Sequence, residues 1–429
     1  MKKLFLFSAV TAGLFTSCVQ NDSIVPELSE AEKEIKFQTV VEKHQTRAII
    51  TGADYGDDAP SFGSTVFWNK TSIELPGVTL NIDNEEVTHH NTEDKDYWGT
   101  AQPYYWPESG SMTFYSYSPY YFQEGNKDEK INPLRPSLGE YGFKFNNYNV
   151  AAHQSTDLMV AEIKYGQTAN VNHGAPDSNI THTGVPTIFH HKLAMIGGFV
   201  LSTSEDYDGL YDGANEDLAK SGDMVFRIKK ITLKNIVMVG SFTSEGISIT
   251  QTGAVEPIAE KWTLSTNSED KMEFVWFDDN SVDRNDNNIN VNDGGVYFGQ
   301  KLSRRLNIAA ANPINAGIYH RIDPQITSTD FTKNAENVLL VIPQEFLTND
   351  ENSPYLEVVY STNVYNGTSW DTPHVITKKM PLSEIHKNGE YKGWQMNKKI
   401  VYELEFATTE IQWAPSVVNW DGENVHVDY

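Results

Sequence analysis

The chain has almost no cysteine, since Cys18 is the only one in its 429 residues. This scarcity excludes disulfides within the chain, cysteine-ligated zinc and a cysteine nucleophile in any downstream domain. Basic residues are also few, with 33 Lys and Arg against 58 Asp and Glu and a formal net charge of −25. Because binding to phosphate backbones needs concentrated positive charge, nucleic acid is not expected as a partner.

Long apolar runs are missing beyond the amino terminus, and no later segment approaches the ~18–20 residues of a spanning helix. At the amino terminus, Lys2 and Lys3 precede an apolar run over 4–15, and small residues precede Cys18. This pattern predicts a lipoprotein signal peptide over 1–17, with Cys18 acylated after cleavage and the chain anchored to a membrane. A plain secretory signal is the alternative, since it also ends in small residues.

Motifs of catalysis are absent as well: the sequence has no G-x-S-x-G, no P-loop and no H-E-x-x-H. We therefore expect no enzymatic activity, no cofactor and no metal. The adjacent pairs His89-His90 and His190-His191 offer poor metal sites, because neighbouring residues of a strand point to opposite faces. The second pair precedes an apolar run, so one of its two members is expected to be a hydrogen-bonded core or strand-end residue.

Two stretches invite a ligand but have simpler explanations. The Asn- and Asp-rich segment 278–295 lacks the ligand spacing of a calcium-binding EF-hand, which favours a solvated loop. A calcium site without EF-hand spacing is the alternative interpretation of this segment. The aromatic run at 104–107, YYWP, could stack on sugar rings, but core and rim residues of a β-sandwich are the favoured interpretation. Carboxylates are abundant, yet no spacing singles out a glycosidase pair.

What the sequence does contain is apolar alternation with a period of two, separated by Gly, Asn and Asp clusters. Strands are predicted at 64–68, 112–118, 193–201, 338–342, 355–360 and 402–406, and the 355–360 strand is expected to pair with 338–342. A change of parity near Lys229 and Lys230 predicts a bulge or a break in that strand. Regularly spaced short strands in an exported chain predict β-sandwiches, and the length suggests two domains, over 48–182 and 183–429.

The stretch over 35–50, IKFQTVVEKHQTRAII, organises the rest of the chain. Its first part alternates like a strand with one buried face, formed by Ile35, Phe37, Thr39 and Val41. A polar segment follows, and an apolar restart begins at Ala48. One cut in the exposed basic segment would separate the first strand from the second.

Several motifs occur in a recognisable order. YYWP at 104–107 is followed by MTFYSYSP at 112–119, and DLM at 157–159 by HKLA at 191–194. Later come VLLVIPQ at 338–344, WQMNKKIVYELEF at 394–406 and IQWAPSVVNW at 411–420. As an ordered set they resemble the fimbrillins, the type V pilus subunits and related lipoproteins of Gram-negative anaerobes. The long Asn-rich segment 278–321 departs from the family pattern and leaves a tip or anchor role open.

The resemblance implies an all-β fold with two tandem transthyretin-like β-sandwich domains, and a lipoprotein precursor displayed in fimbriae at the outer membrane. It implies cleavage by an extracellular Arg-specific protease, which maps onto the Arg47-Ala48 bond, and with it a tether and a removable strand over 18–47. The vacated groove would then be filled by a strand of another fimbrillin-type subunit. Donor candidates lie at the carboxyl end. They are the alternating Val425, Val427 and Tyr429, and the run of Ile411 and Trp413 that Pro415 interrupts.

Both carboxyl-terminal runs could equally stay in their own sheet, since edge strands serve either purpose. The leading hypothesis is a structural and adhesive fimbrial subunit. Its adhesion ligand, a glycan or a protein on a host or bacterial surface, is not fixed by the sequence. The alternative is a glycan-binding surface lipoprotein that does not polymerise.

Overall fold

A computed structural model of the chain describes residues 34–41, 60–70, 79–92, 95–121, 131, 140–153, 156–169, 184–203, 221–222, 224–249, 254–278, 296–298, 320–322, 338–347, 350–386, 392–406 and 411–419. These residues are nearly all β, as the sequence predicts. Helix is confined to short segments such as η1 (Val150–Ala152), η3 (Ser268–Asp270) and α3 (Leu382–Ile385). The described ranges contain no helix with the length and hydropathy needed to cross a membrane.

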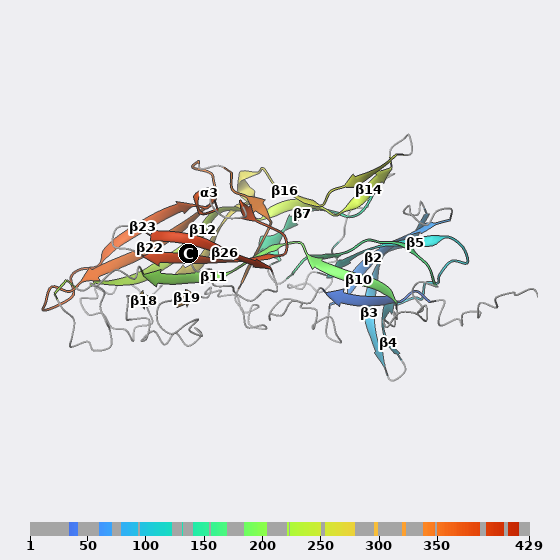
Figure 1. The fold of residues 1–429 in the computed structure, drawn as a ribbon, viewed down its shortest axis with the longest axis horizontal. Coiled ribbons are helices and arrows are strands. Elements are labelled where there is room, and N and C mark those ends of the chain that lie inside the picture. Colours follow the sequence, from blue (N-terminus) through green and yellow to red (C-terminus); the bar gives the residue numbers. More distant parts are fainter. Residues whose placement is uncertain are drawn as a thin grey trace, which may run out of the picture.

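The amino-terminal part of the chain forms an eight-stranded sheet that closes on itself. Its order is β2-β3-β4-β1-β10-β8-β5-β9, and β2 also pairs with β5, which joins the first seven strands into a ring. The strands are β1 (Phe37–Val41), β2 (Phe62–Asn69), β3 (Thr79–Thr92), β4 (Lys95–Thr100), β5 (Ser111–Ser118), β8 (Met159–Ala161), β9 (Lys164–Gln167) and β10 (Val185–His191). We call this element the closed sheet. It lies at one end of an elongated molecule (Figure 1).

Two further sheets form the other end of the molecule. One contains β11 (Ala194–Thr203), β19 (His320–Ile322), β20 (Leu339–Val341), β25 (Lys398–Phe406) and β26 (Ile411–Asn419). The other contains β12 (Met224–Val237), β17 (Lys271–Asp278), β18 (Val296–Phe298), β22 (Tyr355–Val364) and β23 (His374–Pro381). Aromatic rings meet between the sheets, with centroids 5.2 Å apart for Phe199 and Trp276 and for Tyr360 and Phe406. The pair is therefore a sandwich with an aromatic interior.

Small sheets connect the two ends. They are built from β6 (Glu140–Tyr141), β7 (Lys144–Asn149), β13 (Val239–Thr243), β14 (Gly246–Ile249), β15 (Val255–Ile258) and β16 (Lys261–Leu264), with β21 (Gln344–Glu345) beside β24 (Gly393–Trp394). β7 pairs with β13 and β6 with β14, so strands from before and after the 182/183 position lie side by side. That position also falls between β10 and its sheet partners β1 and β8 in the chain.

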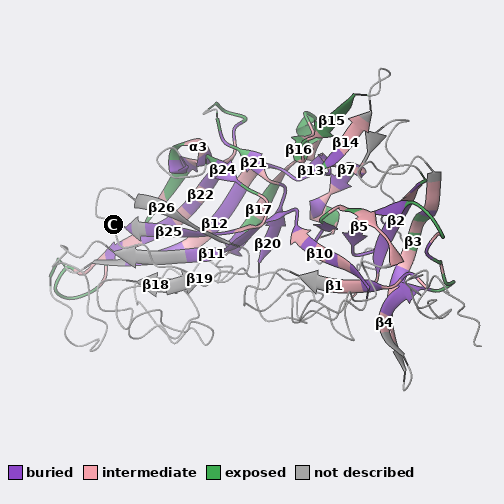
Figure 2. Ribbon diagram, turned by 45° about the vertical axis from the view of Figure 1, so that its right-hand side comes forward, coloured by how far each residue is buried: buried purple, intermediate pink, exposed green. Residues whose placement is uncertain are grey.

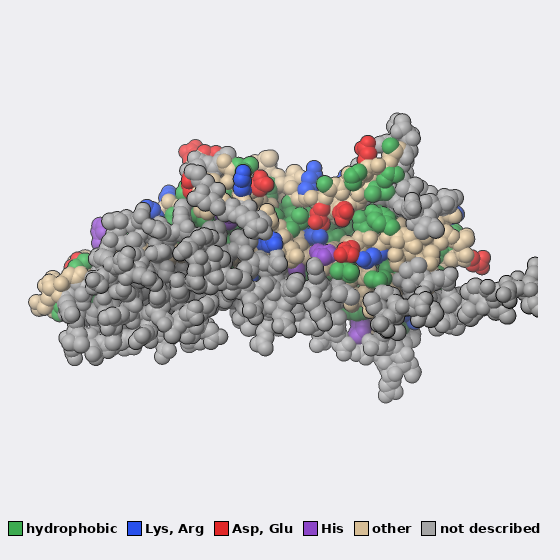
Figure 3. All heavy atoms as spheres, in the orientation of Figure 1, with side chains coloured by type: hydrophobic (Ala, Val, Ile, Leu, Met, Phe, Trp, Pro, Cys, Tyr) green, Lys and Arg blue, Asp and Glu red, His purple; other side chains and the backbone are tan. Residues whose placement is uncertain are grey.

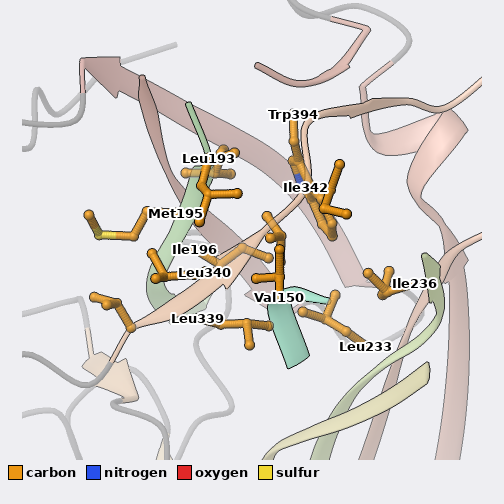
Figure 4. Packing of buried hydrophobic residues seen from close by; sticks show 14 of the residues in the cluster. Val150, Leu193, Met195, Ile196, Leu233, Ile236, Leu339, Leu340, Ile342 and Trp394 are labelled. Atoms are coloured by element: carbon orange, nitrogen blue, oxygen red, sulfur yellow. The ribbon is translucent and has the colours of Figure 1, made fainter. Parts of the chain in front are cut away.

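The buried hydrophobic side chains fall into two clusters. Buried residues, purple in Figure 2, occur on strands at both ends of the molecule. The larger runs from Tyr115 in β5 to Phe406 in β25 and fills the sandwich and the connecting region. Figure 4 shows part of it, where Val150, Leu193 and Ile342 converge from distant points of the sequence. The smaller cluster fills the closed sheet and includes Ile35 and Phe37.

Local sequence patterns located most of these strands. The predicted strands over 64–68, 112–118 and 193–201 correspond to β2, β5 and β11. The predicted bulge is confirmed, because the register of β12 against β22 shifts between Ile228 and Lys230. The inward alternation of the late strand is also confirmed, since Tyr402, Leu404 and Phe406 are all buried.

One predicted strand pairing is wrong. The 355–360 strand was expected to pair with 338–342, but β22 pairs with β12 and β23, and β20 pairs with β11. The two strands therefore belong to opposite sheets of the sandwich. Both are apolar because each faces the same interior, and this shared burial is what made them resemble neighbours in sequence.

Candidate functional site: the slot of the first strand

β1 occupies a slot between β10 and β4 in the closed sheet, as Figure 2 shows for its position beside β10. It runs parallel to β10 along its whole length, from Phe37 opposite Val185 to Val41 opposite Phe189. Toward β4 it pairs only through Phe37 and Trp98 within the described register. β1 thus closes the ring, but it is supported along its length on one side.

The side chains of residues 35 to 37 alternate as predicted, but Thr39, which was also predicted to face inward, is half-buried. Ile35 and Phe37 are each 2% exposed, whereas Lys36, Gln38 and Thr39 are half-buried. The Phe37 ring meets Phe62 at 5.5 Å and Phe114 at 5.8 Å, both in edge-to-face geometry. Such edge-to-face contacts stabilise the packing beyond the free energy gained by burying apolar surface. Val41 lies at the end of the strand, and its side chain is outside the described residues.

The backbone of the segment is fixed just before and at the start of β1. The Ile35 amide donates to the carbonyl of Tyr104 at 2.8 Å, and the Val185 amide donates to the carbonyl of Lys36 at 2.8 Å. Glu34 also forms an isolated antiparallel bridge with Tyr105. Three consecutive residues, 34 to 36, therefore set the register of the strand.

The outward face of the segment carries a small polar cluster. Lys36 Nζ lies 4.5 Å from the centre of the Tyr97 ring, and the Tyr97 hydroxyl donates to Glu34 Oε1 at 3.3 Å. Burial and then the charge of Glu34 raise the pKa of the Tyr97 hydroxyl. The residues of this face are half-buried, whereas Ile35 and Phe37 are almost fully buried, so its contribution to binding is smaller than that of the inward face.

The remaining sequence-predicted sites lie largely outside the described residues. These are Cys18, Arg47, Ala48, Val425, Val427 and Tyr429. The Asn-rich stretch from 279 to 295 also lies outside them. The other donor candidate is described: β26, which contains Ile411, Trp413 and Pro415, pairs antiparallel with β25 along all nine of its residues.

The histidine pairs behave as a strand pattern predicts. His191 is buried and hydrogen-bonds through Nδ1 with Asp157 Oδ2 at 2.6 Å, while His190 lies near the surface, 3.2 Å from Glu162. The first pair splits between faces, with His89 stacked on Trp98. Asp157 and His191 are 34 positions apart in one sequence pattern, and the fold joins them. In the described ranges no three His, Cys, Asp or Glu side chains form a metal-binding group.

The aromatic run at 104–107 divides between core and surface. Trp106 is 8% exposed and packs 5.8 Å from Phe114, whereas Tyr105 is 50% exposed. This division agrees with the interpretation of the run as core and rim of the closed sheet.

A cleft of about 610 Å³ lies where the closed sheet meets the connecting strands. Charged and hydrophobic side chains gather over this junction (Figure 3). Its charged groups are largely paired with one another: Lys192 Nζ lies 2.8 Å from Glu260, and Lys164 Nζ lies 2.6 Å from Glu162. Of these two ion pairs, Lys192–Glu260 joins the closed sheet to the connecting strands, and Lys164–Glu162 lies within the closed sheet.

Sequence patterns located β1 but missed the walls of its slot. Gly184 and Val185 in the approach to β10, and Trp98 and Tyr104 on the other side, lie far from β1 in sequence. The signal that could have pointed to them is the position of Gly184 directly before an alternating strand, where a glycine marks close approach of another backbone.

The fold and the slot define a class of protein: an all-β chain in which a short amino-terminal strand completes a closed sheet. The model of the fimbrillin-like family matches residues 46–277, more than half of the 429 residues, and the chain belongs to that family. The predicted family resemblance is thereby confirmed.

Among solved structures, the chain is similar to a fimbrial protein from Bacteroides vulgatus, with 15% identity, a TM-score of 0.48, and coverage of 90% of this chain and 99% of that one. It is also similar to a fimbrial assembly protein from Parabacteroides distasonis, with 10% identity, a TM-score of 0.29, and coverage of 90% and 98%. The tip fimbrial protein Mfa3 from Porphyromonas gingivalis gives 10% identity, a TM-score of 0.28, and coverage of 90% and 100%. The search of curated proteins found no match.

Proposed function

We propose that the protein is a structural and adhesive subunit of cell-surface fimbriae whose first strand is removed and replaced by a strand of another subunit. The observation that carries the proposal is the place of β1, which fills a gap between two strands and is paired along its length with only one of them. The family match supports the fimbrial role, and it begins at residue 46, after β1 and beside Arg47.

The removal step is a cut at Arg47-Ala48 by an extracellular Arg-specific protease. Cleavage alone does not empty the slot, because Ile35 and Phe37 remain buried. Burial of two such side chains is worth roughly 3–6 kcal/mol, from about 1.5–3 kcal/mol each. The cut strand stays in place until a competing strand displaces it, which ties the opening of the slot to assembly.

The replacing strand adds its backbone to the edges of β10 and β4. Donation of β26 would break its pairing with β25 along nine residues. The terminal run of Val425, Val427 and Tyr429 is therefore the preferred donor within this chain. It alternates apolar and polar residues, as an incoming strand with one buried face requires.

We further infer that the precursor is a lipoprotein anchored at the outer membrane through Cys18. The two domains, over 48–182 and 183–429, would be the transthyretin-like sandwiches of the family. The two hydrophobic clusters support a division into two bodies, but each cluster contains residues from both sides of the 182/183 position.

The decisive experiment determines the amino terminus of the protein isolated from native cells by mass spectrometry. An amino terminus at Ala48, together with a high-mass ladder on gels of unboiled samples, is expected. Arg47→Ala should keep the longer form and abolish the ladder, whereas Lys43→Ala, which removes a nearby basic residue, should change neither. The proposal fails if native wild-type protein keeps residues 35–41 and forms no ladder.

Anchoring has its own test. Cys18→Ala should abolish acylation, measured by incorporation of a labelled fatty acid. Continued labelling of the variant would overturn the lipoprotein assignment.

A further inference from the structure

Gly184 forms a notch in the slot of β1. A Cβ atom on this residue would lie 2.7 Å from the carbonyl carbon and oxygen of Lys36 and 2.9 Å from the carbonyl carbon of Phe37. These are backbone atoms, which cannot swing away as the end of a side chain can. The position requires glycine because another backbone crosses it closely, and any strand that fills the slot must cross at the same place.

The next residue fixes the crossing strand along its axis. The Val185 amide donates to the Lys36 carbonyl at 2.8 Å, and Val185 is opposite Phe37 in the register. A carbonyl that reaches this amide must pass over Gly184. The Gly184-Val185 pair therefore selects one peptide group of the incoming strand.

A ring pocket lies beside this crossing. Phe37 is held edge-to-face by Phe62 and Phe114, which are 0% and 2% exposed. The pocket is apolar and closed, so it suits a phenyl ring. A tyrosine hydroxyl placed there would be buried in an apolar surrounding, and a smaller side chain would leave a cavity.

We propose that Gly184 and the Phe62–Phe114 pocket act together as a register gate, which admits a strand with an aliphatic residue two positions before a phenylalanine. The proposal deepens the strand replacement proposed above and rests on it. The occupant is an extended peptide whose peptide group between these two residues lies on Gly184.

The gate works because errors of register are penalised in different ways. A shift of one residue turns Lys36 toward the ring pocket and carries Ile35 and Phe37 to the outer face. A shift of two residues keeps the alternation but places Ile35 or Thr39 where the ring belongs. The correct register alone combines the backbone crossing with a filled pocket.

The register gate also predicts how well different strands of this chain fit the slot. Ile411-Gln-Trp413 and Val427-Asp-Tyr429 share the spacing of Ile35-Lys-Phe37, with an aromatic residue two positions after an aliphatic one. Their rings differ, since tryptophan is larger and tyrosine carries a hydroxyl. A strand with phenylalanine at this position should therefore be preferred over a second copy of this chain as donor.

The test uses the full chain with Ile35→Ala and Phe37→Ala, which weaken its own β1, and a fluorescent peptide with the sequence of residues 34–41. Anisotropy should report binding to this weakened chain and none to the wild type, whose slot is filled. A peptide with Phe37→Tyr should bind about tenfold or more weakly, as one unsatisfied buried hydroxyl predicts. A peptide with residues 36 and 37 exchanged should show no measurable binding.

The notch is tested by adding Gly184→Val to the weakened chain, which should abolish peptide binding. Gly240→Ala is the matched control, because its Cβ would also be crowded, at 3.0 Å from the Thr263 carbonyl oxygen, but in another sheet. Circular dichroism and thermal unfolding of both variants establish that the remainder of the chain is folded.

Three results would overturn the gate: equal affinity for all peptides, unchanged binding after Gly184→Val in a folded chain, or no uptake of the 34–41 peptide. None of them depends on the cut or on polymers. If instead the peptides discriminate as expected while native protein keeps its first strand and forms no ladder, the proposed function fails and the gate stands.

Discussion

The residues that the structure describes contain two parallel strand pairs, and they differ in how their strands are supported. In the closed sheet, β1 runs parallel to β10 over five residues and meets β4 at Phe37 and Trp98. In the sandwich, β25 runs parallel to β11 from Lys399 to Phe406 and is paired with β26 along all nine of its residues. Under the proposed function, β1 is the strand that is exchanged and β25 is the one that stays in place.

Burial does not explain this difference. Ile35 and Phe37 are 2% exposed, and Tyr402 and Leu404 are 1% and 0% exposed. What distinguishes β25 is pairing on both edges and a polar network, in which the Tyr402 hydroxyl accepts a hydrogen bond from Trp394 Nε1 at 2.8 Å. β1 is therefore as well buried as β25 but is held along its length on one side, which is what the proposed replacement of β1 requires.

The difference between β1 and β25 is tested most directly by truncating one buried side chain in each of the two strands. Leu404→Ala should lower the free energy of unfolding by about 2–5 kcal/mol, because β25 cannot leave the sandwich without unfolding it. Phe37→Ala should cost no more than the free energy that docks β1, because the strand can detach instead. Urea unfolding measures both, with exposed Val375→Ala as a control that should change stability by less than about 0.5 kcal/mol.

Hydrogen exchange completes this test. Phe37→Ala should remove protection at the amides of Ile35 and Val185, which bond to Tyr104 and Lys36, and leave β25 protected. If both variants instead lower global stability equally, β1 unfolds with the whole molecule and the distinction between the two strands is lost.

The sequence predicted features that depend on neighbours in the chain. A parity change located the bulge in β12, and alternation placed Ile35 and Phe37 inward. Long-range pairing was beyond it, because periodicity tells which face of a strand is buried and not which strand lies beside it. This is why β20 was paired with the wrong sheet and why the approach of Gly184 to β1 was missed. Asp157 and His191 are 34 positions apart in one sequence pattern, and the pattern did not reveal that they form one buried pair.

Alkaline pH should affect the sandwich and the connecting region more than the slot. Burial is the first cause that raises the pKa values of the Tyr117, Tyr148 and Tyr402 hydroxyls, all of which belong to the larger cluster. A phenol with a raised folded pKa stabilises fully below the unfolded value of about 10, and this stability is lost as pH rises above it.

Each of these tyrosines should cost about 1.4 kcal/mol per pH unit above pH 10, measured from urea midpoints at successive pH values. Tyr117→Phe should reduce the dependence of the unfolding free energy on pH by about 1.4 kcal/mol per pH unit. The variant also loses the hydrogen bonds to Asn84 and Ile131, and this loss is the same at every pH. A slope that stays unchanged in the variant would show that Tyr117 ionises without unfolding the protein.

The smallest expected effect lies on the outer face of β1. Lys36→Gln removes the charge that lies 4.5 Å above the Tyr97 ring, a contact worth about 0.5–1 kcal/mol at an exposed site. In the peptide of residues 34–41 this should weaken binding roughly two- to fivefold, and added salt should reduce the difference. A loss larger than that from Phe37→Tyr would mean that the outer polar cluster selects the strand. The ring pocket would then not select the incoming strand. The difference between β1 and β25 would depend on charge as well as on strand pairing.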